Sequence, residues 1–180
     1  MAVLFDKLFI QAADMSSYKD ISDHMDESDM KNYIREAQVA DLTPFLGPEL
    51  YLLMQNDFTA PDVWATQKYD DLFNGVDYNS GGKTIRQHGI QPMLTLFTYA
   101  RVLDNVQLSL ARVGPVTYLS EDTSDPTTQA QIKTKIISTR AMAIRYQEEV
   151  EQYLRDLSST YPEWVDRAAK NKTYQFHKIM

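Results

Sequence analysis

The sequence of 180 residues contains no cysteine, which excludes a disulfide framework, a thiolate zinc site and thiol chemistry. It also lacks a run of about 20 apolar residues, the length of a membrane-spanning helix, because Arg, Lys, Asp or Glu interrupts every apolar stretch. The first ten residues contain an acid and show neither the basic start nor the small-residue cleavage site of a signal peptide. We therefore expect a soluble protein without an export signal.

Basic residues are scarce at the start of the chain. The net charge is −7, and residues 1–60 hold 11 acids against 4 bases, whereas the remaining 120 residues hold 14 of each. A chain of this sign offers no basic surface that could grip many phosphates. We therefore expect no sequence-independent binding to nucleic acid, although DNA can pass such a surface without being held.

The sequence has the composition of an ordinary folded domain. Apolar residues make up 43% of it and charged residues 24%, and its length suits one domain with arms. We predict an N-terminal arm (residues 1–25), a helical domain (26–160) and a C-terminal docking tail (161–180). The expected fold is mainly α: a helical bundle with a long C-terminal helix, a small β-hairpin or extended loops, and arms at both ends.

A helix followed by a sharp corner is expected early in the domain. Apolar residues at spacings of three and four predict a helix over residues 27–42. We expect Thr43-Pro44 to end it, because Pro44 lacks an amide hydrogen and disfavours helical geometry at the preceding residue. Gly47 permits a positive φ angle, and Pro48 suits the first turn of a new helix over residues 48–56.

The remaining elements follow from the same periodicity and from turn residues. They are a first strand (4–10), a helix (60–73) ended by Asn74-Gly75, a hairpin centred on residues 79–82, the most buried helix (90–110), a strand (116–119) and a long final helix (127–157). Apolar residues near heptad spacing in the final helix predict that it packs along its length.

One segment approaches two binding motifs. Residues 77–84 match the phosphate-binding pattern G-x-x-x-x-G-K-[ST], except that Asp77 replaces the first glycine and would place a carboxylate against the phosphates. The same segment approaches a calcium loop, but Gly81 and His88 stand where oxygen ligands belong. We interpret the segment as a polar turn and keep a nucleotide-binding enzyme or switch as the least favoured alternative.

Other groups with reactive or metal-binding potential are scattered. Four aspartates recur at every third position from 20 to 29, a pattern that helix N-caps and first turns explain better than a cation site or an acidic docking face. The three histidines occupy separate segments, at His24, His88 and His177. Neither G-x-S-x-G nor H-E-x-x-H occurs. We predict no catalytic residue, no cofactor and no metal.

The last 20 residues differ in composition from the rest of the chain. Four bases are interspersed there with aromatic residues, which is unusual for a plain linker, while the segment is too short for a domain. We interpret it as an arm that docks on its own body or on a neighbour. The residues expected at interfaces, here and in the proline corner, are Pro44, Phe45, Leu46, Gly47, Trp164, Tyr174 and Phe176.

Several strings between residues 33 and 155 stand in a recognisable order. They are Ala37-Gln38, the corner Leu42-Thr43-Pro44-Phe45-Leu46-Gly47-Pro48-Glu49-Leu50-Tyr51, residues 69–75 (Y-x-x-L-x-x-G), residues 89–101 ending in Tyr99-Ala100-Arg101, the turn Gly114-Pro115-Val116, and residues 146–154. In this order they resemble the head-tail connector proteins (adaptor or neck ring proteins) of tailed bacteriophages, especially phages of gut Bacteroidales, including crAss-like phages.

The resemblance implies a structural virion protein rather than an enzyme. It implies a helical subunit of a homo-oligomeric ring, a dodecamer, that joins the portal protein to the tail or to other neck proteins and lets DNA pass as cargo. It places the protein in the neck of the virion, and in the host cytoplasm during assembly, without a membrane partner. It carries over no catalytic residue. A helical adaptor that binds a partner protein is the alternative.

Overall fold

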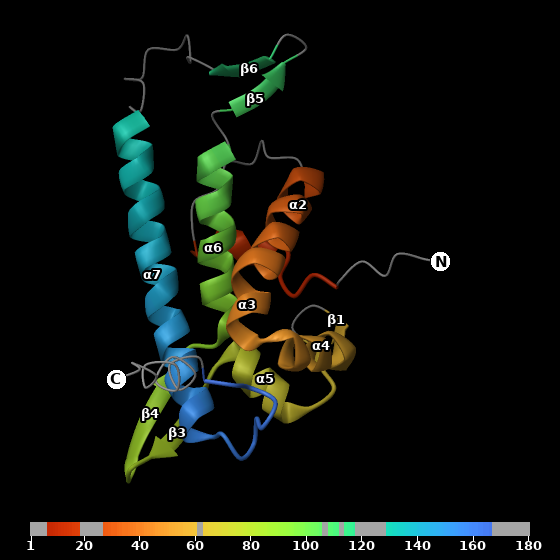
Figure 1. Cartoon of the computed structure of the whole chain (residues 1–180), viewed down its shortest axis with the longest axis vertical. Helices are drawn as coiled ribbons and strands as arrows, with labels where there is room; N and C mark the ends of the chain where they lie inside the picture. Colours follow the sequence, from red (N-terminus) through yellow and green to blue (C-terminus); the bar gives the residue numbers. More distant parts are fainter. Residues whose placement is uncertain are drawn as a thin grey trace, which may run out of the picture.

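A central helix organises the molecule. In the computed structural model, α6 (Ile90–Asn105) lies between α7 (Gln129–Asp156) and α2 (Glu27–Ala37), so the three helices form a layer (Figure 1). Eleven of the 16 residues of α6 are buried, on all sides of the helix. A helix that is apolar all round belongs in a core, and the prediction that this is the most buried helix is confirmed. It ends at Asn105, however, and not near residue 110.

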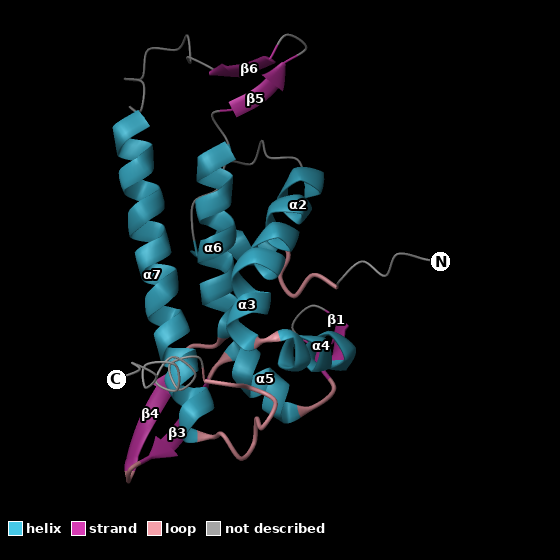
Figure 2. Ribbon diagram, in the orientation of Figure 1, coloured by secondary structure: helices cyan, strands magenta, loops and turns pink. Residues whose placement is uncertain are grey.

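The structure describes residues 7–18, 27–60, 63–105, 108–111, 114–117 and 129–166. The other elements are α1 (Ala12–Tyr18), the π-helix η1 (Gln38–Leu42), α3 (Thr43–Leu46), α4 (Pro48–Asp57), β1 (Phe58–Ala60), β2 (Val63–Trp64), α5 (Gln67–Asn74), β3 (Val76–Ser80), β4 (Lys83–Gln87), β5 (Leu108–Ala111) and β6 (Gly114–Thr117). The fold is mainly α, as predicted, and the described residues include three short antiparallel strand pairs (Figure 2). Among the described helices, none combines the length and the apolar character that crossing a membrane requires.

The first helix does not end at Pro44, so this part of the prediction is wrong. The chain passes from α2 through η1 into α3 with helical angles at the joints, and Thr43 donates its backbone N–H to the Gln38 carbonyl five residues back. A π turn is wider than an α turn. It accommodates Pro44, whose ring would otherwise clash with the carbonyl four residues before it. The corner comes at Gly47, at a φ of 82°, as expected.

The helix expected over residues 60–73 begins later than predicted. Val63 and Trp64 form strand β2, which pairs antiparallel with β1, and helical geometry starts only at Gln67. Side-chain and backbone groups of Thr66 bind the Asp57 carboxylate at 2.5 and 3.0 Å, which holds the extended segment against the end of α4. The end of the helix at Asn74-Gly75 is confirmed, with Gly75 at a φ of 91°.

The predicted hairpin is confirmed. β3 and β4 pair from Val76 opposite Gln87 to Ser80 opposite Lys83, and the two-residue turn consists of Gly81 and Gly82 at φ angles of 57° and 77°. Two consecutive positive φ angles match the twist of the strands, and glycine adopts them without steric cost. The third pair, β5 with β6, replaces the predicted end of the central helix. It contains residues 116 and 117 of the strand expected at 116–119, and residues 118 and 119 lie outside the described residues.

The described start of the chain lies in the core and not in a strand. Residues 7–10 are irregular, so the strand predicted over 4–10 is wrong in its described part, and residues 4–6 lie outside the described residues. The Phe9 ring contacts a cluster of four aromatic rings at centroid distances of 5.2 to 5.9 Å. Gln38 accepts the Phe9 N–H at 2.7 Å, and Gln55 accepts the Lys7 N–H at 2.8 Å. Two glutamine side chains thus accept the backbone N–H groups that a neighbouring strand would otherwise bind.

The long C-terminal helix is confirmed. α7 packs along α6 and continues to the hairpin, where Tyr153 meets Tyr78 edge to face at 4.9 Å (Figure 1). Beyond it, Tyr161 is fully buried and donates its hydroxyl to the Lys68 carbonyl at 2.6 Å. The part of the tail that the structure describes, residues 161–166, therefore folds back against the body of the same chain.

Candidate functional site

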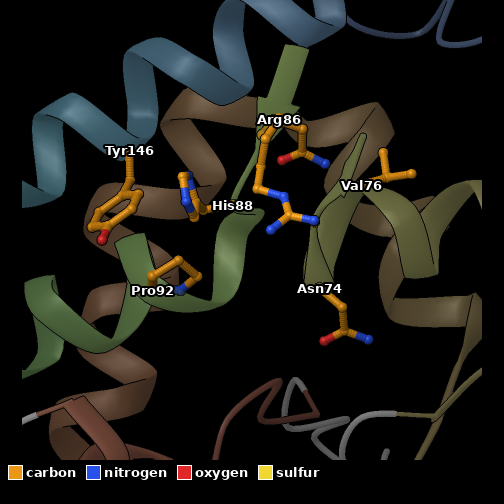
Figure 3. A pocket seen from close by; sticks show the side chains of 8 residues that line it. Asn74, Val76, Arg86, His88, Pro92 and Tyr146 are labelled. Carbon is orange, nitrogen blue, oxygen red and sulfur yellow. The ribbon is translucent and has the colours of Figure 1, made fainter. Parts of the chain in front are cut away.

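A pocket of about 310 Å³ opens where the hairpin meets α6 and α7. It is lined by Asn74, Gly75, Val76, Arg86, Gln87, His88, Pro92 and Tyr146. Figure 3 shows the His88 ring beside Tyr146 of α7, with Arg86 from β4 on its other side. The rings of His88 and Tyr146 meet edge to face at 5.5 Å. The pocket thus joins residues far apart in the sequence.

The two basic side chains of this pocket, Arg86 and His88, already have carboxylate partners within the chain. Arg86 binds Asp77 through two hydrogen bonds of 2.6 and 3.0 Å, and His88 Nδ1 lies 2.7 Å from Glu149 Oε2. The hydrogen bond from Arg86 lowers the pKa of Asp77, whose carboxylate is thereby held in its charged form. An anionic ligand would have to displace these carboxylates. The arrangement is that of an exposed structural junction.

The floor of the pocket is a close crossing of two backbone segments. Gln87 is buried, donates to the Asp71 carbonyl at 2.6 Å and accepts the Gly89 N–H at 2.6 Å. A Cβ atom at Gly75 would lie 2.6 Å from the Gln87 carbonyl oxygen, and one at Gly89 would lie 2.1 Å from that of Phe73. Both positions therefore require glycine. The crossing fixes how the hairpin and α5 sit relative to α6.

A tyrosine cluster links the hairpin, α7 and the start of the tail. Tyr78 donates its hydroxyl to Asp156 at 3.1 Å, and the hydroxyls of Tyr153 and Tyr161 lie 3.3 Å apart. Burial, followed by the contact with Asp156, raises the pKa of Tyr78 to about 12. Burial also raises the pKa of Tyr153 and, more strongly, that of Tyr161. These phenols stay neutral at physiological pH and act as hydrogen-bonding anchors.

Tyr78→Phe is expected to lower the free energy of unfolding by about 1 kcal/mol at neutral pH, through loss of one hydrogen bond. Because the pKa of Tyr78 rises from 10.0 to about 12 on folding, its contribution is complete below pH 10 and is lost as pH rises through 12. The difference between wild type and variant should shrink over that interval in urea titrations. A difference that stays constant from neutral pH to above 12 would contradict the assignment.

The corner residues expected at an interface are only partly exposed. Pro44 is exposed and Gly47 is half-buried, whereas Phe45 and Leu46 pack into the core of their own chain, Leu46 with 1% of its surface exposed. Trp164 is 9% exposed and also packs against its own body, and Tyr174 and Phe176 lie outside the described residues. In this structure the corner presents mainly Pro44 to a partner, and the interface role of these residues stays a prediction.

The structure also shows where the segments with partial binding motifs lie. Residues 77–84 form the hairpin and not a loop before a helix, so the geometry that cradles phosphates is not built there. Of the four aspartates between 20 and 29, only Asp29 lies in the described part of the chain, and so does only His88 of the three histidines. Within the residues that the structure describes, no three His, Asp or Glu side chains gather as a metal site would need.

A second hollow lies on the α2 side of the helical layer. It measures about 560 Å³ and is lined by Asn32, Arg35, Glu36, Val39, Ala40 and Arg101. Beside it, Arg101 of α6 binds Asp41 of η1 with two hydrogen bonds of 2.7 and 3.2 Å in a half-buried ion pair. Val39, on the outer side of η1, is 54% exposed. The hollow therefore combines an apolar edge with polar walls.

The opposite edge of the layer carries an apolar stripe that periodicity alone did not identify. Ile137 and Ile144 of α7 are 69% and 47% exposed, and the exposed Ala141 lies between them. Residues spaced by four and three share one helical face, and this face points away from the buried Ala143 and Val150. The heptad pattern accounts for the inner face only. The two isoleucines seven residues apart, outside that pattern, were the available signal.

Comparisons with known proteins give one match. The model of a family of unknown function, DUF6712, matches residues 42–174 and thus most of the helical domain. No curated protein and no solved structure matches the chain.

Proposed function

The chain belongs to the DUF6712 family, a family of unknown function, and we propose that it is a structural subunit of a tailed-bacteriophage neck. In this proposal copies of the chain form a ring, a dodecamer, that joins the portal to the tail or to other neck proteins and lets DNA pass. The proposal starts from the ordered strings between residues 33 and 155, above all the corner from Ala37 to Tyr51. It places the protein in the virion neck, and in the host cytoplasm during assembly.

The observation that carries the proposal is the pair of unlike edges on the three-helix layer. α6 is enclosed, while α2 with η1 forms one edge and α7 the other (Figure 1). Each edge exposes aliphatic side chains, Val39 on one and Ile137 and Ile144 on the other. A subunit with two different adhesive edges associates head to tail, and such contacts close into a ring when the rotation between subunits permits it.

The charge of the chain suits a ring around passing DNA. The net charge of −7 would keep a channel wall from holding the phosphate backbone, because like charges repel and few basic contacts form. DNA would then slide through without being bound.

Native mass spectrometry of the purified chain, alone and with a phage portal, tests the proposal. The expected result is one closed oligomer of twelve copies, whose fraction rises with protein concentration because assembly follows mass action. A monomer at every concentration, with portal and without, would contradict it. A complex of one chain with one partner protein would instead favour a helical adaptor.

A further inference from the structure

We propose that the outer face of α7 of one copy packs against the α2–η1 edge of a neighbouring copy. The inference rests on the proposed ring and identifies its subunit contact. The α7 surface consists of Lys133, Ile137, Arg140, Ala141 and Ile144, all exposed. The surface that receives it consists of Asp29, Asn32, Glu36, Val39 and Ala40, which are exposed as well.

The α7 surface is apolar along its middle and basic along one side. The first 19 residues of α7 contain four bases and no acid, whereas its last nine contain four acids and one base. Two of these bases, Lys133 and Arg140, lie next to the isoleucines on one side of the stripe, and neither has an ion-pair partner among the described residues. A helix face of this kind favours an acidic partner with an apolar centre.

The α2–η1 edge carries two exposed carboxylates beside apolar residues. Arg35 and Arg101 also line its hollow, and the charge of Arg101 is balanced there by Asp41. Asp29 lies in the first turn of α2 and Glu36 in the third, and both are exposed. The pKa of Tyr33 is raised mainly by burial and also by the negative charges of these two carboxylates. Val39 and Ala40 continue this side as apolar residues and line the hollow of about 560 Å³. The hollow has room for an aliphatic side chain such as Ile137 or Ile144 of a neighbour.

The two surfaces match in length and in position along the layer. Both run over 11 residue steps, from 133 to 144 and from 29 to 40, which corresponds to about 16 Å of helix each. α2 and α7 begin at the same end of the layer, whereas α6 runs in the opposite direction (Figure 1). Subunits at the same height along a common ring axis can therefore bring the two surfaces into contact, as a closed ring requires.

A second copy of the chain is the occupant that the charges favour, and they also favour the head-to-tail arrangement. Two α7 faces packed against each other would oppose Lys133 and Arg140 with their own copies. Two α2 edges would likewise oppose Asp29 and Glu36 with theirs. Like charges brought together at an interface cost several kcal/mol of binding free energy. Packing α7 of one copy against α2 of the next instead places bases opposite acids.

Cysteine cross-linking tests the contact directly, because the chain contains no cysteine of its own. Ile137→Cys and Val39→Cys are single changes at exposed positions and should leave the fold intact. A short bis-maleimide should cross-link a mixture of the two variants and neither variant alone. Val63→Cys, 50% exposed and outside both surfaces, serves as the matched control in place of Val39→Cys and should give no cross-link with Ile137→Cys.

Charge exchange provides an independent readout. Arg140→Glu and Glu36→Arg should each raise the protein concentration needed for half-assembly by about tenfold or more, and the double variant should recover most of the loss. Higher salt should also raise the protein concentration that the wild type needs for half-assembly, because salt screens the charges. Failure of the double variant to recover would overturn the pairing of these two surfaces.

The outcomes separate this inference from the proposed function. Rings that form in native mass spectrometry without a cross-link between positions 39 and 137 would overturn the inference and leave the ring in place. Cross-linking of Ile137→Cys with itself would show a two-fold α7 contact and overturn the inference as well. Absence of any assembly would overturn both.

Discussion

Gly89→Ala should lower the free energy of unfolding by about 4 kcal/mol, which is most of the stability of a domain at the lower end of the ordinary range of about 5–15 kcal/mol. The new Cβ would lie 2.1 Å from the Phe73 carbonyl oxygen and 2.7 Å from the Gly75 nitrogen, which are backbone atoms that cannot rotate away. A φ of 84° adds the strain of a left-handed conformation. Overpacking costs about 1–3 kcal/mol and the left-handed conformation about 1–2 kcal/mol.

Gly81→Ala is the matched control for this prediction. Gly81 also has a positive φ, of 57°, but a Cβ there would meet no atom within 4 Å. Urea denaturation should therefore show a loss of about 1 kcal/mol for Gly81→Ala. Equal losses for the two variants would mean that the crossing of Gly75 and Gly89 beneath the pocket is not tightly packed.

Gln38→Ala is expected to lower the free energy of unfolding by about 3 kcal/mol. The side chain is fully buried, accepts the Phe9 N–H at 2.7 Å, and donates to the Lys7 carbonyl at 3.0 Å and to the Tyr51 hydroxyl at 3.2 Å. Its removal leaves the Phe9 N–H buried without an acceptor and creates a small cavity, and the two effects add. Hydrogen exchange should show that the Phe9 amide loses its protection before the backbone amides of α6 do.

The control for Gln38 is a glutamine with local bonds only. Gln67 is exposed and donates to Asp70 and Asp71 on the same helix, so Gln67→Ala should cost less than about 0.5 kcal/mol. If Gln38→Ala were as mild as Gln67→Ala, the start of the chain would not depend on the two glutamines for its place in the core.

Elements whose signals are local were predictable from the sequence. The turn at Gly81 and Gly82 fixed the hairpin, and apolar spacing located α6 and α7. Three features depend on contacts between distant residues and were missed. The π-helix keeps the chain helical through Pro44, the pairing of Val63 and Trp64 with β1 delays α5, and Phe9 needs the side chains of Gln38 and Gln55. Tertiary contacts overrode local preference at each of these places.

The candidate surfaces were less predictable than the fold. Phe45 and Leu46 belong to the string on which the resemblance rests, but the structure packs them into their own core. A buried hydrophobic residue and an exposed one are the same letter in a sequence, so only packing distinguishes them. Ile137 and Ile144 became visible as a surface once α6 was seen to cover the other side of α7.

Electron microscopy of the purified chain in negative stain is the measurement that tests ring formation most directly. We expect closed rings of uniform diameter with twelvefold symmetry in end views, which disappear in the Arg140→Glu variant and return when Glu36→Arg is added. Monomers in every field at concentrations well above those used for native mass spectrometry, or two-fold dimers packed through α7, would contradict it.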